Sequence, residues 1–178
     1  MIITSRKAHS LTELLIASVI VVFLFISAIG AFMLTQNAYS DSIATYNLQR
    51  DINIALATMI RGVKEPAGTF GLRSGAPSST TPAMPSTEIQ FIQPGDDPPI
   101  VRKFFLTNNT IVYESPTQNP TQKVIYTPPG NSNVTLTFSE PSADEQLVTI
   151  YVSVLQQRGG RSSVGSVTTN VNLRNTPK

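Results

Sequence analysis

Glu13 is the residue whose chemistry most needs an explanation, because it is the only carboxylate among the first 40 residues and stands beside an oily segment. The 21 residues that follow it, 14–34, carry no charge. A charged side chain costs about 2.5 to 3.5 kcal/mol at the centre of a bilayer and less near its surface. Glu13 is therefore expected either to meet a cationic partner or to lie among lipid headgroups, in a first helical turn whose dipole favours negative charge.

Other reactive side chains are scarce. The 178 residues include one histidine, His9, and no cysteine, so one chain cannot assemble a Ser-His-Asp triad, a thiolate nucleophile or a multi-histidine metal site. The net charge is +2 and only 13% of the residues are charged, which disfavours a basic surface for a nucleic-acid backbone. We therefore expect no catalytic residue, no cofactor, no metal and no direct nucleic-acid binding.

The element that must position Glu13 is the apolar segment 14–34. As a helix it would rise about 31 Å, which matches a hydrocarbon core of about 30 Å. Arg6 and Lys7 precede it and the next charge is Asp41, so the positive-inside rule predicts a cytoplasmic N-terminus and an external body. Three interpretations are open at this point: a cleaved secretory signal, a plain membrane anchor, or a subunit that is processed before Glu13.

The string KAHSLTELLIASVIVV, residues 7–22, resembles the N-terminal signature of type IV prepilins. In that family a basic leader ends in a small residue, and a glutamate at the fifth mature position opens a long apolar helix. On this alignment Ala8 ends a leader of residues 1–8, His9 begins the mature chain and Glu13 is its fifth residue. The family usually has glycine and then phenylalanine or methionine at the two cleavage positions, so Ala8 and His9 depart from its pattern.

The resemblance implies roles for four residues. Prepilin peptidase would cleave between Ala8 and His9, and the new amino terminus would be N-methylated. Its ammonium and the Glu13 carboxylate would then neutralise one another, within a subunit or between stacked subunits, and set the register of assembly. Gly30 lies about where related subunits carry a helix breaker, so it is a candidate melting point.

The resemblance also implies partners and a location. The partners are the prepilin peptidase, membrane lipid before assembly, an inner-membrane assembly platform, and other minor and major pilins or pseudopilins. The subunit would cross the inner membrane once, with its C-terminal domain in the periplasm, and would enter a periplasmic filament.

A second helical pattern follows the apolar segment, and no proline interrupts the chain before Pro66. Apolar side chains recur at spacings of three and four at Leu48, Ile52, Ala55, Leu56, Met59, Ile60 and Val63. The pattern predicts one helix over residues 9–63, with a membrane span at about 14–34 and a single apolar stripe in its second half. Residues 64–87, rich in proline, glycine and serine, are expected to form a loop.

Residues 88–178 have the alternating pattern of half-buried strands. Seven runs show it: EIQFI, VRKFFL, TIVYE, QKVIY, NVTLTF, LVTIYVSVL and SVTTNVNL. Asn108–Asn109 and Gly159–Gly160 are predicted hairpin turns, since asparagine and glycine accept the left-handed backbone that such turns need. We expect an α+β fold in which the second half of the helix packs on a small antiparallel sheet.

The second half of the chain extends the resemblance. The strings QRDINIALATMIRGV, FFLTNNTIVYE and VNLRN are similar to segments of J-type minor pseudopilins of type II secretion systems and of the related PilW-like minor pilins. The implied function is that of a minor subunit in a type II secretion or type IV pilus filament, and a DNA-uptake apparatus is also open. The alternative is a single-pass anchored or secreted β-rich binding domain that does not polymerise.

Several polar groups suggest sites but are better explained by ordinary structure. Asp96 and Asp97, and the acidic group around Pro141 (Glu140, Asp144 and Glu145), lack the spacing of a calcium loop and are predicted to be solvated turns. Arg158 and Arg161 flank the Gly-Gly turn and are interpreted as the charged flanks of a hairpin tip. The aromatic residues of the strands are expected to pack in the sheet core.

Overall fold

The computed structural model describes residues 10–140 and 147–173. Within these ranges the chain forms one long helix followed by ten strands, so the expected α+β class is confirmed. The elements are α1 (Leu11–Arg61), β1 (Val63–Glu65), β2 (Gly68–Phe70), β3 (Ala76–Pro77), β4 (Glu88–Ile92), β5 (Val101–Thr107), β6 (Thr110–Glu114), β7 (Gln122–Tyr126), β8 (Ser132–Ser139), β9 (Leu147–Arg158) and β10 (Arg161–Asn172).

The chain divides into two compact units, residues 1–43 and 44–178, and α1 contributes to both. In the described part of the first unit there is only the N-terminal part of α1, whose side chains are almost all exposed. The second unit contains the C-terminal part of α1 and all ten described strands.

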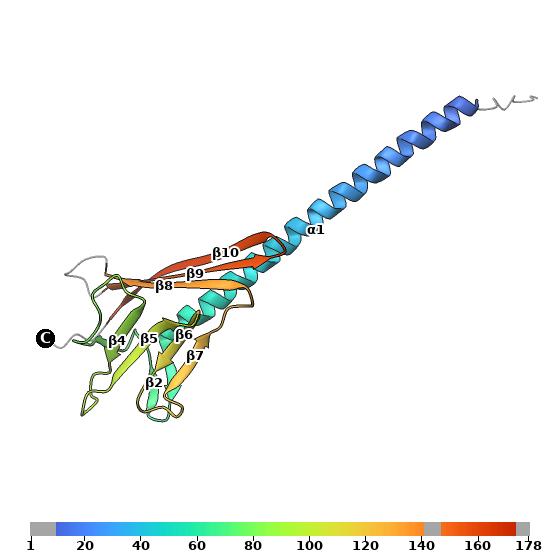
Figure 1. Cartoon of the computed structure of the whole chain (residues 1–178). Helices are drawn as coiled ribbons and strands as arrows, with labels where there is room; N and C mark the ends of the chain where they lie inside the picture. Colours follow the sequence, from blue (N-terminus) through green and yellow to red (C-terminus); the bar gives the residue numbers. More distant parts are fainter. Residues whose placement is uncertain (1–9, 141–146, 174–178) are drawn as a thin grey trace, which may run out of the picture. The chain divides into compact units, whose positions relative to one another are not determined.

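The strands of the second unit form three antiparallel sheets (Figure 1). A five-stranded sheet has the order β3-β4-β5-β6-β7, a three-stranded sheet has the order β10-β9-β8, and β1 pairs with β2. The two larger sheets meet where Ser86 and Phe138 exchange backbone hydrogen bonds of 3.0 and 2.7 Å. The expected single sheet is thus divided, and all seven predicted strands are present as β4–β10.

Both predicted hairpin turns are confirmed. Thr107 pairs with Thr110, and Asn108 and Asn109 between them have φ angles of 46° and 62°. Arg158 pairs with Arg161 across Gly159 and Gly160, whose φ angles are 57° and 78°. Two successive residues of positive φ give the turn a twist that matches the right-handed twist of its strands.

The apolar stripe of α1 forms part of the core of the second unit. Leu48, Ile52, Ala55, Leu56 and Met59 are buried and belong to one cluster with the inward-facing side chains of both larger sheets. Removal of such side chains from water stabilises the fold by about 1.5 to 3 kcal/mol for each large aliphatic group. β10 approaches the helix so closely that a Cβ on Gly165 would lie 2.9 Å from the Cβ of Leu48.

The helix ends at Arg61 because Gly62 has a φ of 117°, which leaves the helical region. Carbonyl groups of its last turn accept hydrogen bonds from the next segment: Leu72 N donates to Met59 O at 3.0 Å, and Arg73 N donates to Ile60 O at 3.1 Å. A Cβ on Gly71 would lie 2.5 Å from the Cα of Gly62. Residues 71–73 therefore hold the C-terminal end of α1 in place.

Residues 64–87 differ from the expected loop, since β1, β2 and β3 occupy part of this range. The strands are only two or three residues long, and each depends on pairing with another segment. Val63, predicted as the last apolar position of the helix, lies in β1 and is buried there.

Candidate functional site

The described chain begins with a reciprocal cap on α1. Ser10 N donates to Glu13 Oε2 at 3.1 Å, and Glu13 N donates to Ser10 Oγ at 3.3 Å. This is a capping box, in which serine and glutamate three residues apart satisfy backbone N–H groups that the helix leaves free. Glu13 lies in the first turn of α1. This is the position at which the helix dipole favours a negative charge. Ala8 and His9 lie outside the described residues.

The S-x-x-E spacing of Ser10 and Glu13 is the sequence signature of a capping box. The interpretation of Glu13 from its charge beside the apolar segment missed this signal. Glu13 therefore caps α1 through a local hydrogen bond, in addition to any function that its negative charge has.

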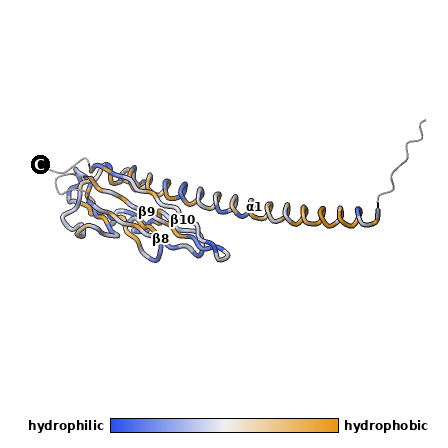
Figure 2. The backbone as a smooth tube through the Cα atoms, turned by 90° about the horizontal axis from the view of Figure 1, so that it is seen from above, coloured by the Kyte–Doolittle hydropathy of each residue, from blue (hydrophilic) through white to orange (hydrophobic). Residues whose placement is uncertain are grey.

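After the cap, the hydrophobic colour predominates along the N-terminal part of α1 (Figure 2). Its large apolar residues between 14 and 34 are exposed by 46% to 73%, from Val19 to Leu34. The hydroxyl groups of Ser18 and Ser27 donate to carbonyl oxygens of their own helix, Leu15 O and Phe23 O, each at 2.8 Å. The polar groups of this segment are thus satisfied within the helix, as a lipid environment requires.

By length and composition α1 can cross a membrane, and the described residues bury none of its most apolar stretch. The helix continues through Gly30, and no atom would lie within 4 Å of a Cβ placed there. Packing among the described residues therefore does not require glycine at position 30.

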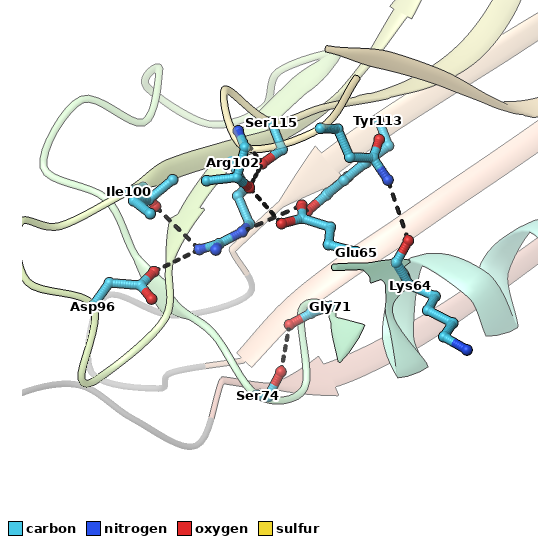
Figure 3. Close-up of polar contacts among 11 residues, drawn as sticks. Lys64, Glu65, Gly71, Ser74, Asp96, Ile100, Arg102, Tyr113 and Ser115 are labelled. Atoms are coloured by element: carbon cyan, nitrogen blue, oxygen red, sulfur yellow. Dashed lines mark hydrogen bonds and ion pairs between the residues drawn. The ribbon is translucent and has the colours of Figure 1, made fainter. Parts of the chain in front are cut away.

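A buried polar cluster lies in the second unit, where β1 meets β5 and β6 (Figure 3). Its centre is the pair of Glu65 on β1 and Arg102 on β5, which are only 4% and 1% exposed. Arg102 Nε lies 3.5 Å from Glu65 Oε1, and Arg102 Nη1 lies 2.6 Å from Asp96 Oδ2. The Arg102 guanidinium also stacks on the ring of Phe70, 3.8 Å from its centroid.

Glu65 accepts two further hydrogen bonds. Tyr113 Oη donates to Oε1 and Thr117 Oγ1 donates to Oε2, each at 2.5 Å. Burial alone would raise the pKa of Glu65, but the hydrogen bonds from Thr117, Tyr113 and Ser115 and the charge of Arg102 together lower that pKa below its ordinary value. Burial and the hydrogen bond to Glu65 raise the pKa of Tyr113. The cluster therefore holds an ionised Glu65 beside a neutral tyrosine at neutral pH.

The cluster corrects one prediction. Asp96 was expected to be a solvated turn residue, but its carboxylate pairs with Arg102 and is only 18% exposed. Asp97 is exposed, as expected. Arg102 was not singled out, although its spacing from Phe104 placed it on the inward face of β5. Glu65 gave no comparable signal, because the strand that positions it forms only through tertiary pairing.

Aromatic side chains surround the cluster. The ring centroids of Phe91 and Phe104 are 5.5 Å apart, and those of Phe104 and Tyr113 are 5.0 Å apart. All three residues are buried, as are Tyr126 and Phe138, which confirms the prediction that they pack in the sheet core. Tyr151 corrects the same prediction, because it is 39% exposed. The described residues contain no group of three or more histidine, aspartate or glutamate side chains placed to hold a metal ion.

A polar groove of about 620 Å³ lies at the turn between β9 and β10. Residues 131–133 and 157–162 line it, and we call it the tip groove. Arg158 and Arg161 are both exposed there, and none of the nine lining residues is acidic. Asn131 and the first two residues of β8, Ser132 and Asn133, line the groove beside the hairpin tip.

Comparisons of the chain with protein-family models, with characterised proteins and with solved structures give no match.

Proposed function

We propose that the chain is a type IV pilin-like subunit, a minor pilin or pseudopilin that prepilin peptidase processes and that enters a filament through its N-terminal helix. The observation that carries the proposal is the character of α1. One continuous helix has a fully exposed apolar part beginning at the Ser10–Glu13 cap, and its last residues belong to a folded domain. A helix with this apolar surface can lie in lipid before assembly and pack among the helices of other subunits after assembly.

The cap supports the proposed role of Glu13 in register. Its carboxylate is held at the backbone N–H of Ser10, the residue directly after His9. Cleavage after Ala8 would create an ammonium group one residue before that N–H. The cap thus holds the Glu13 carboxylate one residue along the chain from the amino group that cleavage would create, and that carboxylate could pair with the ammonium of its own subunit or of the next one.

Before assembly, the helix would cross the inner membrane with Arg6 and Lys7 in the cytoplasm and the second unit in the periplasm. The assembly platform and other pilins or pseudopilins are the partners that follow from this proposal. A type II secretion system, a type IV pilus and a DNA-uptake apparatus all use subunits of this design.

Sequencing of the mature N-terminus in membranes that contain the peptidase tests the processing step. A chain that begins at His9 supports the proposal. A chain that begins at Met1 indicates a plain anchor, and one that begins near Ala31 indicates a secreted domain.

Two substitutions separate the charge of Glu13 from its capping role. Glutamine also forms capping boxes, so Glu13→Gln keeps the cap and removes the charge, whereas Ser10→Ala weakens the cap and keeps the charge. We expect Glu13→Gln to be inserted and cleaved but lost from filaments, and Ser10→Ala to assemble. The opposite result, with Glu13→Gln in filaments at wild-type amounts, would leave Glu13 as a helix cap only.

A further inference from the structure

The three-stranded sheet of β8, β9 and β10 has an outward face without any charged residue (Figure 1). Successive side chains of a strand point to opposite faces of its sheet, and one face of this sheet, with Leu136 and Ile150, lies in the core. The other face, which we call the neutral face, consists of every second residue of 133–139, 147–157 and 162–172. All of these residues are uncharged, and most are serine, threonine or asparagine.

This composition differs from that of an ordinary surface in water. Charged residues occupy roughly a quarter to a third of the positions on a surface that keeps a protein soluble. The outward face of the five-stranded sheet has such residues, since it carries Glu88 and the ion pair of Lys103 and Glu114. The neutral face therefore suits an uncharged ligand better than an anion or a cation.

Tyr151 lies near the middle of the neutral face. It belongs to the central strand β9 and is 39% exposed, and it pairs with Thr137 of β8 on one side and Thr168 of β10 on the other. Its ring offers an apolar surface, whereas the threonine hydroxyl groups can both donate and accept hydrogen bonds. The neutral face thus places one aromatic ring among many hydroxyl groups.

The chemistry of this face matches a saccharide more closely than a protein. The cores of protein interfaces are rich in aromatic residues, methionine and arginine and poor in serine, whereas Tyr151 and Val164 are the large apolar side chains most exposed on the neutral face. A sugar ring has hydroxyl groups around its rim and an apolar C–H surface that can pack on an aromatic ring. A linear β-1,4-linked glucan is uncharged and extended, so its successive sugars can contact several strands at once.

We propose that the neutral face binds a neutral, extended polysaccharide, with Tyr151 packed on a sugar ring and the surrounding hydroxyl groups hydrogen-bonded to the sugars. The tip groove adjoins this surface, because Asn133, Gln157 and Ser162 belong to both. A longer polymer would therefore also reach the amide groups of the groove. The proposal involves residues of the second unit alone and does not depend on the proposed function of α1.

The test measures binding of the full chain, kept in detergent micelles, to immobilised hydroxyethyl cellulose, a neutral β-1,4-linked glucan. Carboxymethyl cellulose has the same backbone with added carboxylates, and amylose has the same sugar in a helical polymer. Salt at about 0.5 M screens the net charge of +2. We expect the tightest binding to hydroxyethyl cellulose, weaker binding to amylose, and no gain from the carboxylates.

Substitutions on the neutral face locate the binding. Tyr151→Ala should weaken it by about two- to tenfold, and Tyr151→Phe, which keeps the ring, should retain most of it. Tyr46→Ala removes a more exposed tyrosine, 67%, from α1 and should have no effect. Thr168→Glu should weaken binding by at least about tenfold, because the polymer would strip water from the new charge. The neutral variant Thr168→Gln should retain most of the binding.

Equal binding by the wild type, Tyr151→Ala and Thr168→Glu would overturn the proposal, as would tighter binding to carboxymethyl cellulose or no binding to any of the polymers. Sedimentation of the same samples detects a second copy as the occupant, and a dimer that Thr168→Glu dissociates would also overturn the proposal. Thermal unfolding of each variant verifies that the outward substitutions leave the fold intact. Cleavage and filament assembly are measured separately, so failure here leaves the proposed function unaffected.

Discussion

Replacement of Glu65 by leucine tests whether the buried cluster holds β1 to the five-stranded sheet. The substitution removes the acceptor of the hydrogen bonds from Tyr113 and Thr117 and leaves Arg102 with Asp96 as its remaining carboxylate. Each hydrogen bond to a charged group contributes about 1.5 to 3 kcal/mol, and the buried leucine returns about 1.5 to 3 kcal/mol. The buried hydroxyl group of Tyr113, left without its acceptor, costs about 1 to 3 kcal/mol.

The free energy of unfolding is therefore expected to fall by about 3 to 5 kcal/mol, the range typical of a broken buried ion pair. Denaturant titration of the full chain in detergent, followed by tyrosine fluorescence and circular dichroism, measures the change. A matched control is Glu114→Gln, since the Lys103–Glu114 pair on the same sheet has a similar separation of 3.2 Å but side chains about 30% exposed. Its loss should cost less than about 1 kcal/mol.

A second substitution separates pairing from packing. Arg102→Met added to Glu65→Leu removes a buried cation that has lost one of its two carboxylate partners and keeps only Asp96, so the double variant should be no less stable than Glu65→Leu alone. If Glu65→Leu costs no more than Glu114→Gln, the cluster does not stabilise the fold and the reasoning is refuted. If the double variant is much less stable than Glu65→Leu, Arg102 contributes mainly through its stacking on Phe70.

Three further outcomes are expected. The lowered pKa of Glu65 makes its contribution to stability complete above about pH 4.5, its ordinary pKa, and lost as the pH falls through the folded pKa, so Glu65→Gln should flatten the acid limb of a stability-against-pH profile. Gly165→Val places a Cβ 2.9 Å from that of Leu48 and should lower the unfolding free energy by about 1 to 3 kcal/mol, whereas Gly130→Ala, in open space, should change it little in the same titration. Asn109→Ala loses two hydrogen bonds to β8 and a residue suited to its φ of 62°, so thermal unfolding should show a loss of about 2 to 4 kcal/mol.

The parts of the fold that could be predicted from the sequence are those that depend on local patterns. Buried and more exposed residues alternate along β4, β8 and most of β9. The Asn108–Asn109 and Gly159–Gly160 turns use residues that accept positive φ. The buried stripe of α1 follows from the spacing of its apolar residues. These local patterns predict the fold correctly because the apolar faces that they mark are the faces that pack in the core.

The parts that could not be predicted depend on contacts between distant segments. β1 forms because Val63 pairs with Phe70 of β2. Glu65 can be buried because it forms an ion pair with Arg102, 37 positions later in the chain. Asp96 reads as a surface turn until the register of β5 places Arg102 beside it. Composition around Glu65 is that of a loop, and no local rule distinguishes a loop carboxylate from a buried one.

The apolar stripe of α1 also determines where the protein can be cut for study. Leu48, Ile52 and Leu56 cover the inner faces of both larger sheets, so a fragment that begins after Arg61 would expose those faces to water and aggregate. A water-soluble version of the β-rich part should instead retain the helix from about Ala44, where the second unit begins, and discard only what precedes it.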